Sequence, residues 1–132
     1  MKNKLLILIA LLVFGSHANA EQKALIDIKA PTDLDNIHVV KLNSDRNSTD
    51  FVIFIRKQVP LHKHVKHSET LYVLEGSGQM QLGDETIRVH PGDYIKVPEG
   101  VVHGVIVDSE NPLKVLSVQA PEFFGKDRVK VD

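Results

Sequence analysis

The chain has 132 residues, a formal net charge of −1 at neutral pH and no cysteine. A chain of this length has room for one compact domain and not for two. The nearly balanced charge gives no electrostatic reason to expect nucleic acid or an anionic membrane as a partner. Without cysteine there are no disulfides and no thiolate metal sites, so stability has to come from the core, from a bound metal or from association.

Residues 1–20 have the three parts of a secretory signal peptide. Lysines form a basic start, residues 5–14 are an unbroken apolar run, and residues 18–20 read Ala-Asn-Ala, a typical cleavage site. The apolar run is shorter than the roughly 20 residues that a spanning helix needs, and no cysteine follows it as a lipid attachment site. We therefore expect an exported protein, periplasmic or secreted, that begins near Glu21 and has no membrane anchor in its mature form.

The rest of the chain is dominated by short runs rich in β-branched and aromatic residues, separated by turn-forming residues, which is typical of β-strands. The expected strands cover residues 37–42, 51–55, 71–74, 79–82, 86–89, 94–97, 104–107 and 113–118. Only residues 21–29 could be helical, so the pattern favours an all-β sandwich or barrel. We expect the charged tail 121–132 to be mostly irregular, with Phe123 and Phe124 packed on the barrel or on a partner subunit.

Four residues in two short stretches, 61–69 and 91–103, have the chemistry of a metal site. His62 and His64 are two positions apart, so on an extended strand both side chains point to the same face. Glu69 follows a few residues later, and His103 comes from a distant strand. Three imidazoles and one carboxylate are able to hold one divalent transition metal ion, such as Fe, Mn, Ni, Cu or Zn. Such a set leaves one or two coordination positions open for water or substrate.

The spacing of these residues resembles the two sequence motifs of the cupin superfamily. The pattern His-x-His-x4-Glu-x6-Gly, from His62 to Gly76, is similar to the first motif. The pattern Gly-x5-Pro-x-Gly-x2-His, from Gly92 to His103, is similar to the second. The glycines of both motifs are expected in turns with positive φ, where they aim the ligands.

The resemblance implies a small single-domain bacterial cupin with a quercetinase-like barrel. Its fold would be all-β, a double-stranded β-helix or jelly-roll barrel over residues 21–132, with its core in residues 36–120. In the family, the residues at the positions of His62, His64, Glu69 and His103 hold the metal.

The function that the resemblance implies is less specific than the site. Small cupins with this ligand set resemble dioxygenases that act on a small phenolic or enediol-like molecule, and Glu69 would then also be a catalytic proton acceptor. Two alternatives use the same residues: a non-redox, metal-dependent isomerase or lyase, and a non-enzymatic metal-binding or small-ligand-binding protein. Whether the protein is an enzyme is therefore left open by its sequence.

Two other residues have more than one interpretation. His67 is either solvated, a hydrogen-bond partner of the ligand shell, or a substrate contact. Arg56 stands where the first motif usually opens with Gly, and Val107 where the second usually closes with Asn. We expect Arg56 to be solvated, the alternative being a contact to an anionic substrate inside the barrel. Exposed edge strands also predict a homodimer, built by residues 26–42 and by barrel-face strands.

Overall fold

The computed structural model describes residues 20–131, so the expected signal peptide lies outside the described residues except for Ala20. One turn of 3-10 helix, Leu25–Asp27, is followed by ten strands. The strands are β1 Ile37–Ser44, β2 Thr49–Ile55, β3 Gln58–Lys63, β4 Ser68–Glu75, β5 Gly78–Leu82, β6 Glu85–Val89, β7 Tyr94–Val97, β8 His103–Val107, β9 Leu113–Ala120 and β10 Val129–Lys130. Within residues 20–131, no helix is long and apolar enough to cross a membrane.

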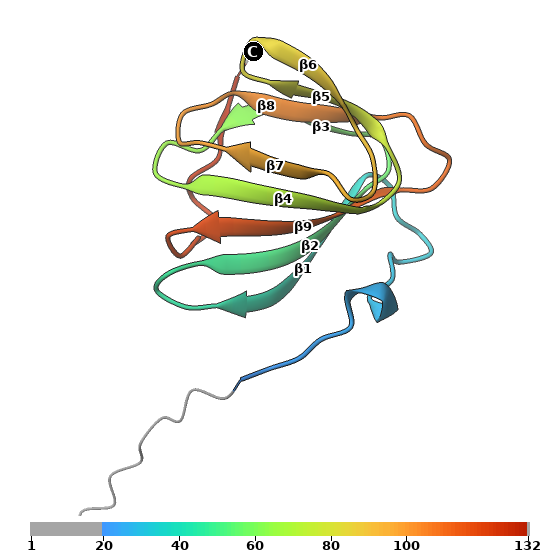
Figure 1. The fold of residues 1–132 in the computed structure, drawn as a ribbon, viewed down its shortest axis with the longest axis horizontal. Coiled ribbons are helices and arrows are strands. Elements are labelled where there is room, and N and C mark those ends of the chain that lie inside the picture. Colours follow the sequence, from blue (N-terminus) through green and yellow to red (C-terminus); the bar gives the residue numbers. More distant parts are fainter. Residues whose placement is uncertain (1–19, 132) are drawn as a thin grey trace, which may run out of the picture.

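The strands form two five-stranded antiparallel sheets that face each other (Figure 1). The first has the order β1-β2-β9-β4-β7, and the second has the order β10-β3-β8-β5-β6. Several neighbouring strands lie far apart in the sequence, because β2 pairs with β9 and β3 pairs with β8. The all-β double-stranded β-helix predicted from the sequence is therefore confirmed, and each strand predicted from local composition lies within an observed strand except for small differences at the ends.

Two strands were not predicted from local composition. β3 contains Pro60, which removes one backbone N–H from the sheet, and its pairing with β8 shifts register between Val59 and His62. Such an irregularity is where a strand tolerates proline. β10 is two residues long and pairs with β3 at the edge of the second sheet. The segment that could have been helical, residues 21–29, contains only the single 3-10 turn.

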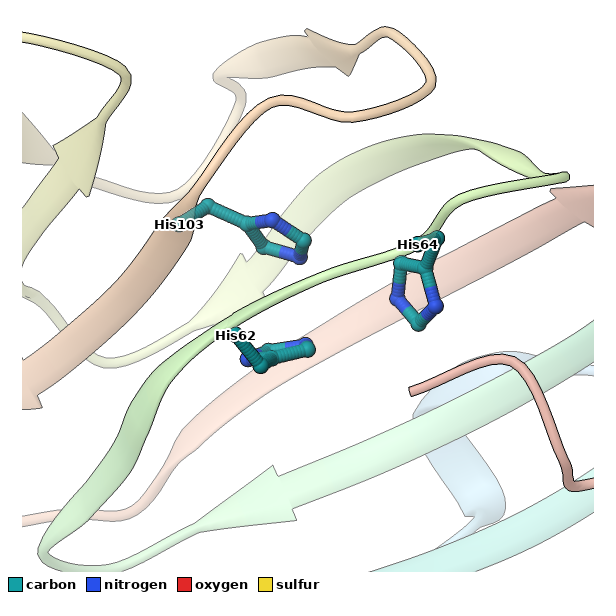
Figure 2. Close-up of side chains that lie close together, drawn as sticks. All are labelled: His62, His64 and His103. Carbon is teal, nitrogen blue, oxygen red and sulfur yellow. The ribbon is translucent and has the colours of Figure 1, made fainter. Parts of the chain in front are cut away.

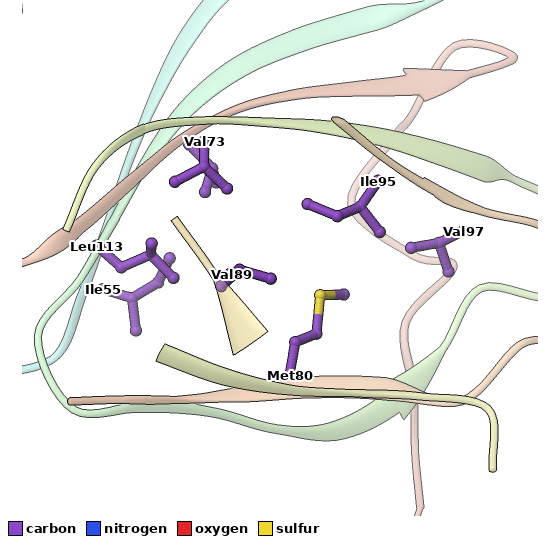
Figure 3. Close-up of a cluster of buried hydrophobic side chains, with 8 residues drawn as sticks. Ile55, Val73, Met80, Val89, Ile95, Val97 and Leu113 are labelled. Carbon is purple, nitrogen blue, oxygen red and sulfur yellow. The ribbon is translucent and has the colours of Figure 1, made fainter. Parts of the chain in front are cut away.

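The main core lies between the two sheets (Figure 3). Its buried members are Ile55, Val73, Met80, Val89, Ile95, Val97, Leu113 and Val115. Because alternate residues of a strand point to opposite faces, the neighbours of these residues point out of the barrel. On β2 the outward residues Val52 and Phe54 form a second buried cluster with Leu34, which the N-terminal residues before β1 cover. The N-terminal segment therefore shields the outer face of the first sheet.

Two glycines of the sequence motifs adopt backbone conformations that favour glycine and lie close to other backbone atoms. Gly76 has a φ of +76°, and a Cβ atom added there would lie 2.7 Å from the carbonyl oxygen of Pro112. Gly100 also has a φ of +76°, and its N–H donates a 2.6 Å hydrogen bond to the carbonyl oxygen of His64. The expectation of positive φ at the motif glycines is confirmed. Gly100 also ties the second motif directly to a histidine of the first.

Candidate metal centre

Three buried imidazoles gather at one end of the space between the sheets (Figure 2). His62 in β3 and His103 in β8 are register partners in the second sheet, and their ring centroids are 4.2 Å apart. His64 follows β3 directly, with its ring centroid 5.2 Å from that of His62 and 5.4 Å from that of His103. One ring nitrogen from each histidine lies within 4.8 Å of the other two. The expected grouping of the three imidazoles is therefore present.

Each imidazole is oriented by a hydrogen bond between Nδ1 and a backbone carbonyl. His62 and His103 each bond to the carbonyl two residues earlier, at 2.9 and 3.0 Å, and His64 bonds to the carbonyl of Asp127. A carbonyl oxygen only accepts, so Nδ1 carries the proton and Nε2 keeps a free lone pair. His64 Nε2 is buried and has no hydrogen-bond partner within residues 20–131. Tautomers fixed in this way are typical of histidines that bind metal through Nε2.

A buried carboxylate faces the imidazoles from the opposite sheet. Glu69 in β4 places Oε2 at 3.2 Å from Nε2 of His103 and at 3.8 Å from Nε2 of His64. Its other oxygen, Oε1, accepts hydrogen bonds from the Ser117 hydroxyl and, at 3.3 Å, from the Gln119 amide. One oxygen is therefore anchored to β9, and the other is directed at the imidazoles. All four residues predicted from the motif spacing lie together.

The protonation states of these groups suit a cation. Burial, reinforced by the nearby His103, lowers the pKa of His62 to about 4, so this imidazole is neutral at pH 7. Burial alone would raise the pKa of Glu69, but its close contact with the His103 imidazole and the hydrogen bond from Ser117 outweigh burial and lower the pKa below its usual range. Metal binding requires neutral imidazoles and ionised carboxylates. The donor set therefore fits a divalent transition metal ion, one of the ions that imidazole and carboxylate ligands suit.

The imidazoles and Glu69 line one end of a cavity of about 250 Å³. Most of its wall is apolar and comes from both sheets, including Phe51, Ile53, Leu71, Val73, Met80 and Val105. Phe123 and Arg128, which follow the last long strand, also contribute to the wall. A small ligand in this cavity would therefore contact the imidazoles and Glu69 on one side and mostly hydrocarbon elsewhere.

Residues 121–131, here called the C-terminal segment, are irregular apart from the two-residue β10, as expected, and pack against the imidazoles. β10 in this segment pairs with β3 beside His62. The Phe123 ring lies edge-on to the rings of His64 and His67, with centroids 5.9 and 5.2 Å away. Phe124 is 74% exposed, so only one of the two expected ring contacts is formed with the barrel.

Asp127 is the anchor of the C-terminal segment. Its carboxylate accepts hydrogen bonds from the N–H groups of Val65 and Lys66, at 2.9 and 2.7 Å, and from Nδ1 of His67 at 2.6 Å. Burial opposes ionisation, but these donors outweigh it and hold the pKa of Asp127 at about 2. Since the carbonyl of the same residue orients His64, Asp127 fixes both the loop that carries His64 and the ring itself.

Of the three interpretations of His67, the solvated one is wrong, because the C-terminal segment buries this residue. Its Nδ1 donates to Asp127 and its Nε2 donates to the carbonyl of Glu122 at 3.0 Å. Burial lowers the pKa of His67, but these hydrogen bonds and the Asp127 charge raise it above its ordinary value. Arg56, by contrast, is exposed, and its Nε donates to the carbonyl of Leu34, in agreement with the expected position outside the barrel.

Sequence reasoning missed Ser117, Gln119 and Asp127, and it placed Phe123 on the barrel or on a partner subunit without connecting it to the site. Ser117 and Gln119 point to the same face of β9 as the core residues Leu113 and Val115. Polar residues at positions that face the core could have identified them from the sequence. Asp127 and Phe123 carried no such signal, because their role depends on a contact with residues some sixty positions earlier.

Two antiparallel sheets that enclose buried histidines and a carboxylate define a double-stranded β-helix barrel with a polar site at one end of an apolar cavity. Residues 55–119 match the Cupin domain family. The chain belongs to the cupin superfamily, as the spacing of its motifs predicted.

Similar proteins agree with this assignment. An uncharacterized protein of Aquifex aeolicus is 34% identical over 99 residues, which are 75% of this chain and 81% of that protein. The quercetin 2,3-dioxygenase of Bacillus subtilis is 38% identical over 63 residues, 48% of this chain, but this match spans only 18% of the enzyme. The crystal structure of an uncharacterized double-stranded β-helix protein from Klebsiella pneumoniae has a TM-score of 0.73 at 17% identity, covering 86% of this chain and 99% of that one. At that identity the structural likeness concerns the fold.

Proposed function

We propose that this cupin binds one divalent transition metal ion through His62, His64, His103 and Glu69. The observation that carries the proposal is the buried Nε2 atom of His64, which has no hydrogen-bond partner within residues 20–131 and faces a carboxylate oxygen 3.8 Å away. A buried polar atom without a partner is unfavourable, and a cation placed among the three imidazoles would supply one. The ionised Glu69 would balance part of the charge of that cation.

The proposed activity is that of a metal-dependent enzyme of dioxygenase type, acting on a small phenolic or enediol-like molecule. The similarity to the Bacillus subtilis quercetin 2,3-dioxygenase supports this reaction class. When bound, the ion would supply a Lewis-acidic centre for an oxygen atom of the substrate. The apolar wall of the cavity would exclude water, and Glu69 Oε2 would accept the proton of a substrate hydroxyl, because Oε1 is already occupied by Ser117 and Gln119.

The proposal includes the cellular setting that the sequence predicts. Residues 1–20 would be removed as a signal peptide, and residues 21–132 would form the mature barrel domain in the periplasm or outside the cell. The mature protein would work as a homodimer with a small molecule as its only other partner.

Metal binding is tested by elemental analysis of protein purified from its own periplasm and by melting with and without a chelator. Ligand binding to the native state stabilises it by mass action, so chelation should lower the melting temperature of the wild type. A His64→Ala/His103→Ala variant should show almost no change. The control is His38→Ala/His90→Ala, which removes two exposed histidines and should respond like the wild type. Equal shifts in all three proteins would reject the site.

The enzymatic role is tested by oxygen uptake with flavonols and small phenols, at saturating metal. Glu69→Gln keeps the size of the side chain and one oxygen ligand but removes the basic site. If Glu69 is the proton acceptor, turnover should fall by about 10²–10⁴-fold while metal remains bound. Full turnover in Glu69→Gln would reject the base role. Turnover of enediols without oxygen would instead favour the isomerase or lyase, and no turnover by the wild type would favour a binding protein.

A further inference from the structure

A buried polar side chain interrupts the apolar wall of the cavity beside the imidazoles. Gln119 lines the cavity and is 6% exposed. Its Nε2 donates to Oε1 of Glu69, whereas its own Oε1 is buried and has no hydrogen-bond partner within residues 20–131. Buried acceptors are almost always paired. An acceptor left free in the wall of a ligand cavity is therefore available to a donor that the ligand carries.

The orientation of this amide is fixed by its neighbour. The oxygen and nitrogen of a glutamine are assigned from the hydrogen-bond network, and an ionised carboxylate can only accept. Glu69 Oε1 therefore requires the Nε2 side of Gln119, so the amide cannot be reversed. β9 places Gln119 on the same face as Leu113 and Val115, both of which line the cavity. The free oxygen thus belongs to a side chain on the cavity face of the strand.

The size of the cavity limits what the ligand can be. Its volume of about 250 Å³ is below the roughly 300–1,000 Å³ of sites that enclose drug-sized molecules. A ligand of about one aromatic ring matches this space and its apolar wall. Gln119 is the register partner of Glu69 across β4 and β9, so the free acceptor lies next to the carboxylate that faces the imidazoles.

We propose that the site selects small apolar ligands that carry two neighbouring oxygen atoms. One oxygen would occupy an open position on the metal, and the other would be a hydroxyl that donates to Gln119 Oε1. The ligand class is thus a one-ring vicinal diol, such as a catechol, or an enediol of similar size. This inference rests on the proposed metal site and adds Gln119 as the residue that determines specificity.

The test compares catechol with phenol, which lacks the second hydroxyl. Both dissociation constants are measured by calorimetry without oxygen on Zn²⁺-loaded protein, so that binding is observed apart from turnover. In Gln119→Met the preference for catechol over phenol should fall at least about tenfold relative to the wild type, as expected for a lost hydrogen bond to a buried acceptor. Phenol affinity should stay nearly constant, which also shows that the variant is folded.

Ser117→Ala is the matched control, because it also removes one donor to Glu69 Oε1 but leaves the Gln119 oxygen in place. It should keep the catechol preference of the wild type. An unchanged preference in Gln119→Met would overturn the inference, since chelation of the metal alone would then explain the selectivity. Equal loss in both variants would overturn it too, because the effect would come from Glu69.

Metal content is measured first, which separates this inference from the proposed function. Wild-type protein that takes up no Zn²⁺ would reject the metal site itself. A second measurement needs no variant: the side-chain amide NMR signals of Gln119 in the Zn²⁺-loaded wild type should shift on addition of catechol and not of phenol. Identical responses to the two probes would contradict a hydrogen bond from the second hydroxyl.

Discussion

Replacing Asp127 with Asn should destabilise the protein although the side chain keeps its size. The carboxylate uses one oxygen for the N–H of Val65 and the other for the N–H of Lys66 and for His67. An Asn amide has only one oxygen, so its NH2 group would face donors in either orientation. Loss of one charged hydrogen bond and one neutral one predicts a decrease of about 2–4 kcal/mol in the free energy of unfolding. Urea unfolding of metal-free protein, followed by circular dichroism, measures this decrease.

The fold offers a matched control in Asp93, which accepts hydrogen bonds from the N–H and Nδ1 of His90. That pair is exposed, with side chains 43% and 55% accessible, against 13% and 9% for Asp127 and His67. Exposed ion pairs contribute little, so Asp93→Asn should cost less than about 1 kcal/mol. Equal losses in the two variants would refute the reasoning that burial makes the Asp127 interactions strong.

The Asp127–His67 pair also predicts how the loss of unfolding free energy in Asp127→Asn depends on pH. The pKa of Asp127 is about 2 in the folded state and ordinarily 3.8. The ionised carboxylate therefore stabilises the fold fully above about pH 3.8, and this stabilisation is lost as the pH falls toward 2. The pKa of His67 is raised from 6.5, so its contribution is complete below pH 6.5 and is lost as the pH rises through the raised value. The difference between wild type and Asp127→Asn should be greatest between these limits. A difference independent of pH would contradict the ion pair.

Three further predictions concern the metal, a turn and the assembly. Metal occupancy should fall as the pH is lowered from 7 to 4.5, because protons compete for the imidazoles; elemental analysis after desalting checks this, and constant occupancy would contradict the three-histidine site. Gly76→Ala should lose about 1–3 kcal/mol more unfolding free energy than Gly92→Ala in urea titrations. Both positions have positive φ, but only at Gly76 would the new Cβ meet backbone atoms. Light scattering at tens of micromolar protein should give the mass of a dimer, and a monomer would count against the predicted association.

Much of the barrel could be predicted from local sequence because its strands follow local rules. Runs such as residues 51–55 and 94–97 are rich in β-branched and aromatic residues, and each lies within an observed strand. β3 was harder to predict because Pro60 interrupts it, and β10 because a two-residue strand has no periodicity. Both depend on pairing with distant residues, which local propensity does not encode.

In the candidate site, too, some residues could be predicted from their spacing in the sequence, whereas others depend on contacts with distant residues. Strand geometry places His62 and His64 on one face, and Glu69 and His103 could be added because the spacing of all four residues resembles the cupin motifs. Asp127 could not, since a single aspartate in a charged tail has the same local pattern whether it is solvated or, as here, bonded to the loop that carries His64. The choice among the three interpretations of His67 depended on its contact with Asp127, so it could not be made from the sequence.

The packing of the C-terminal segment has a consequence for the order in which the site is completed. All four proposed ligands precede residue 104, whereas the carbonyl that orients His64 and the ring that packs against it belong to residues 127 and 123. During synthesis, which proceeds from the N-terminus, the imidazoles emerge before the residues that hold His64 in place. An ion captured at that stage would meet an unrestrained His64 and would exchange more readily than one bound after β10 has joined β3.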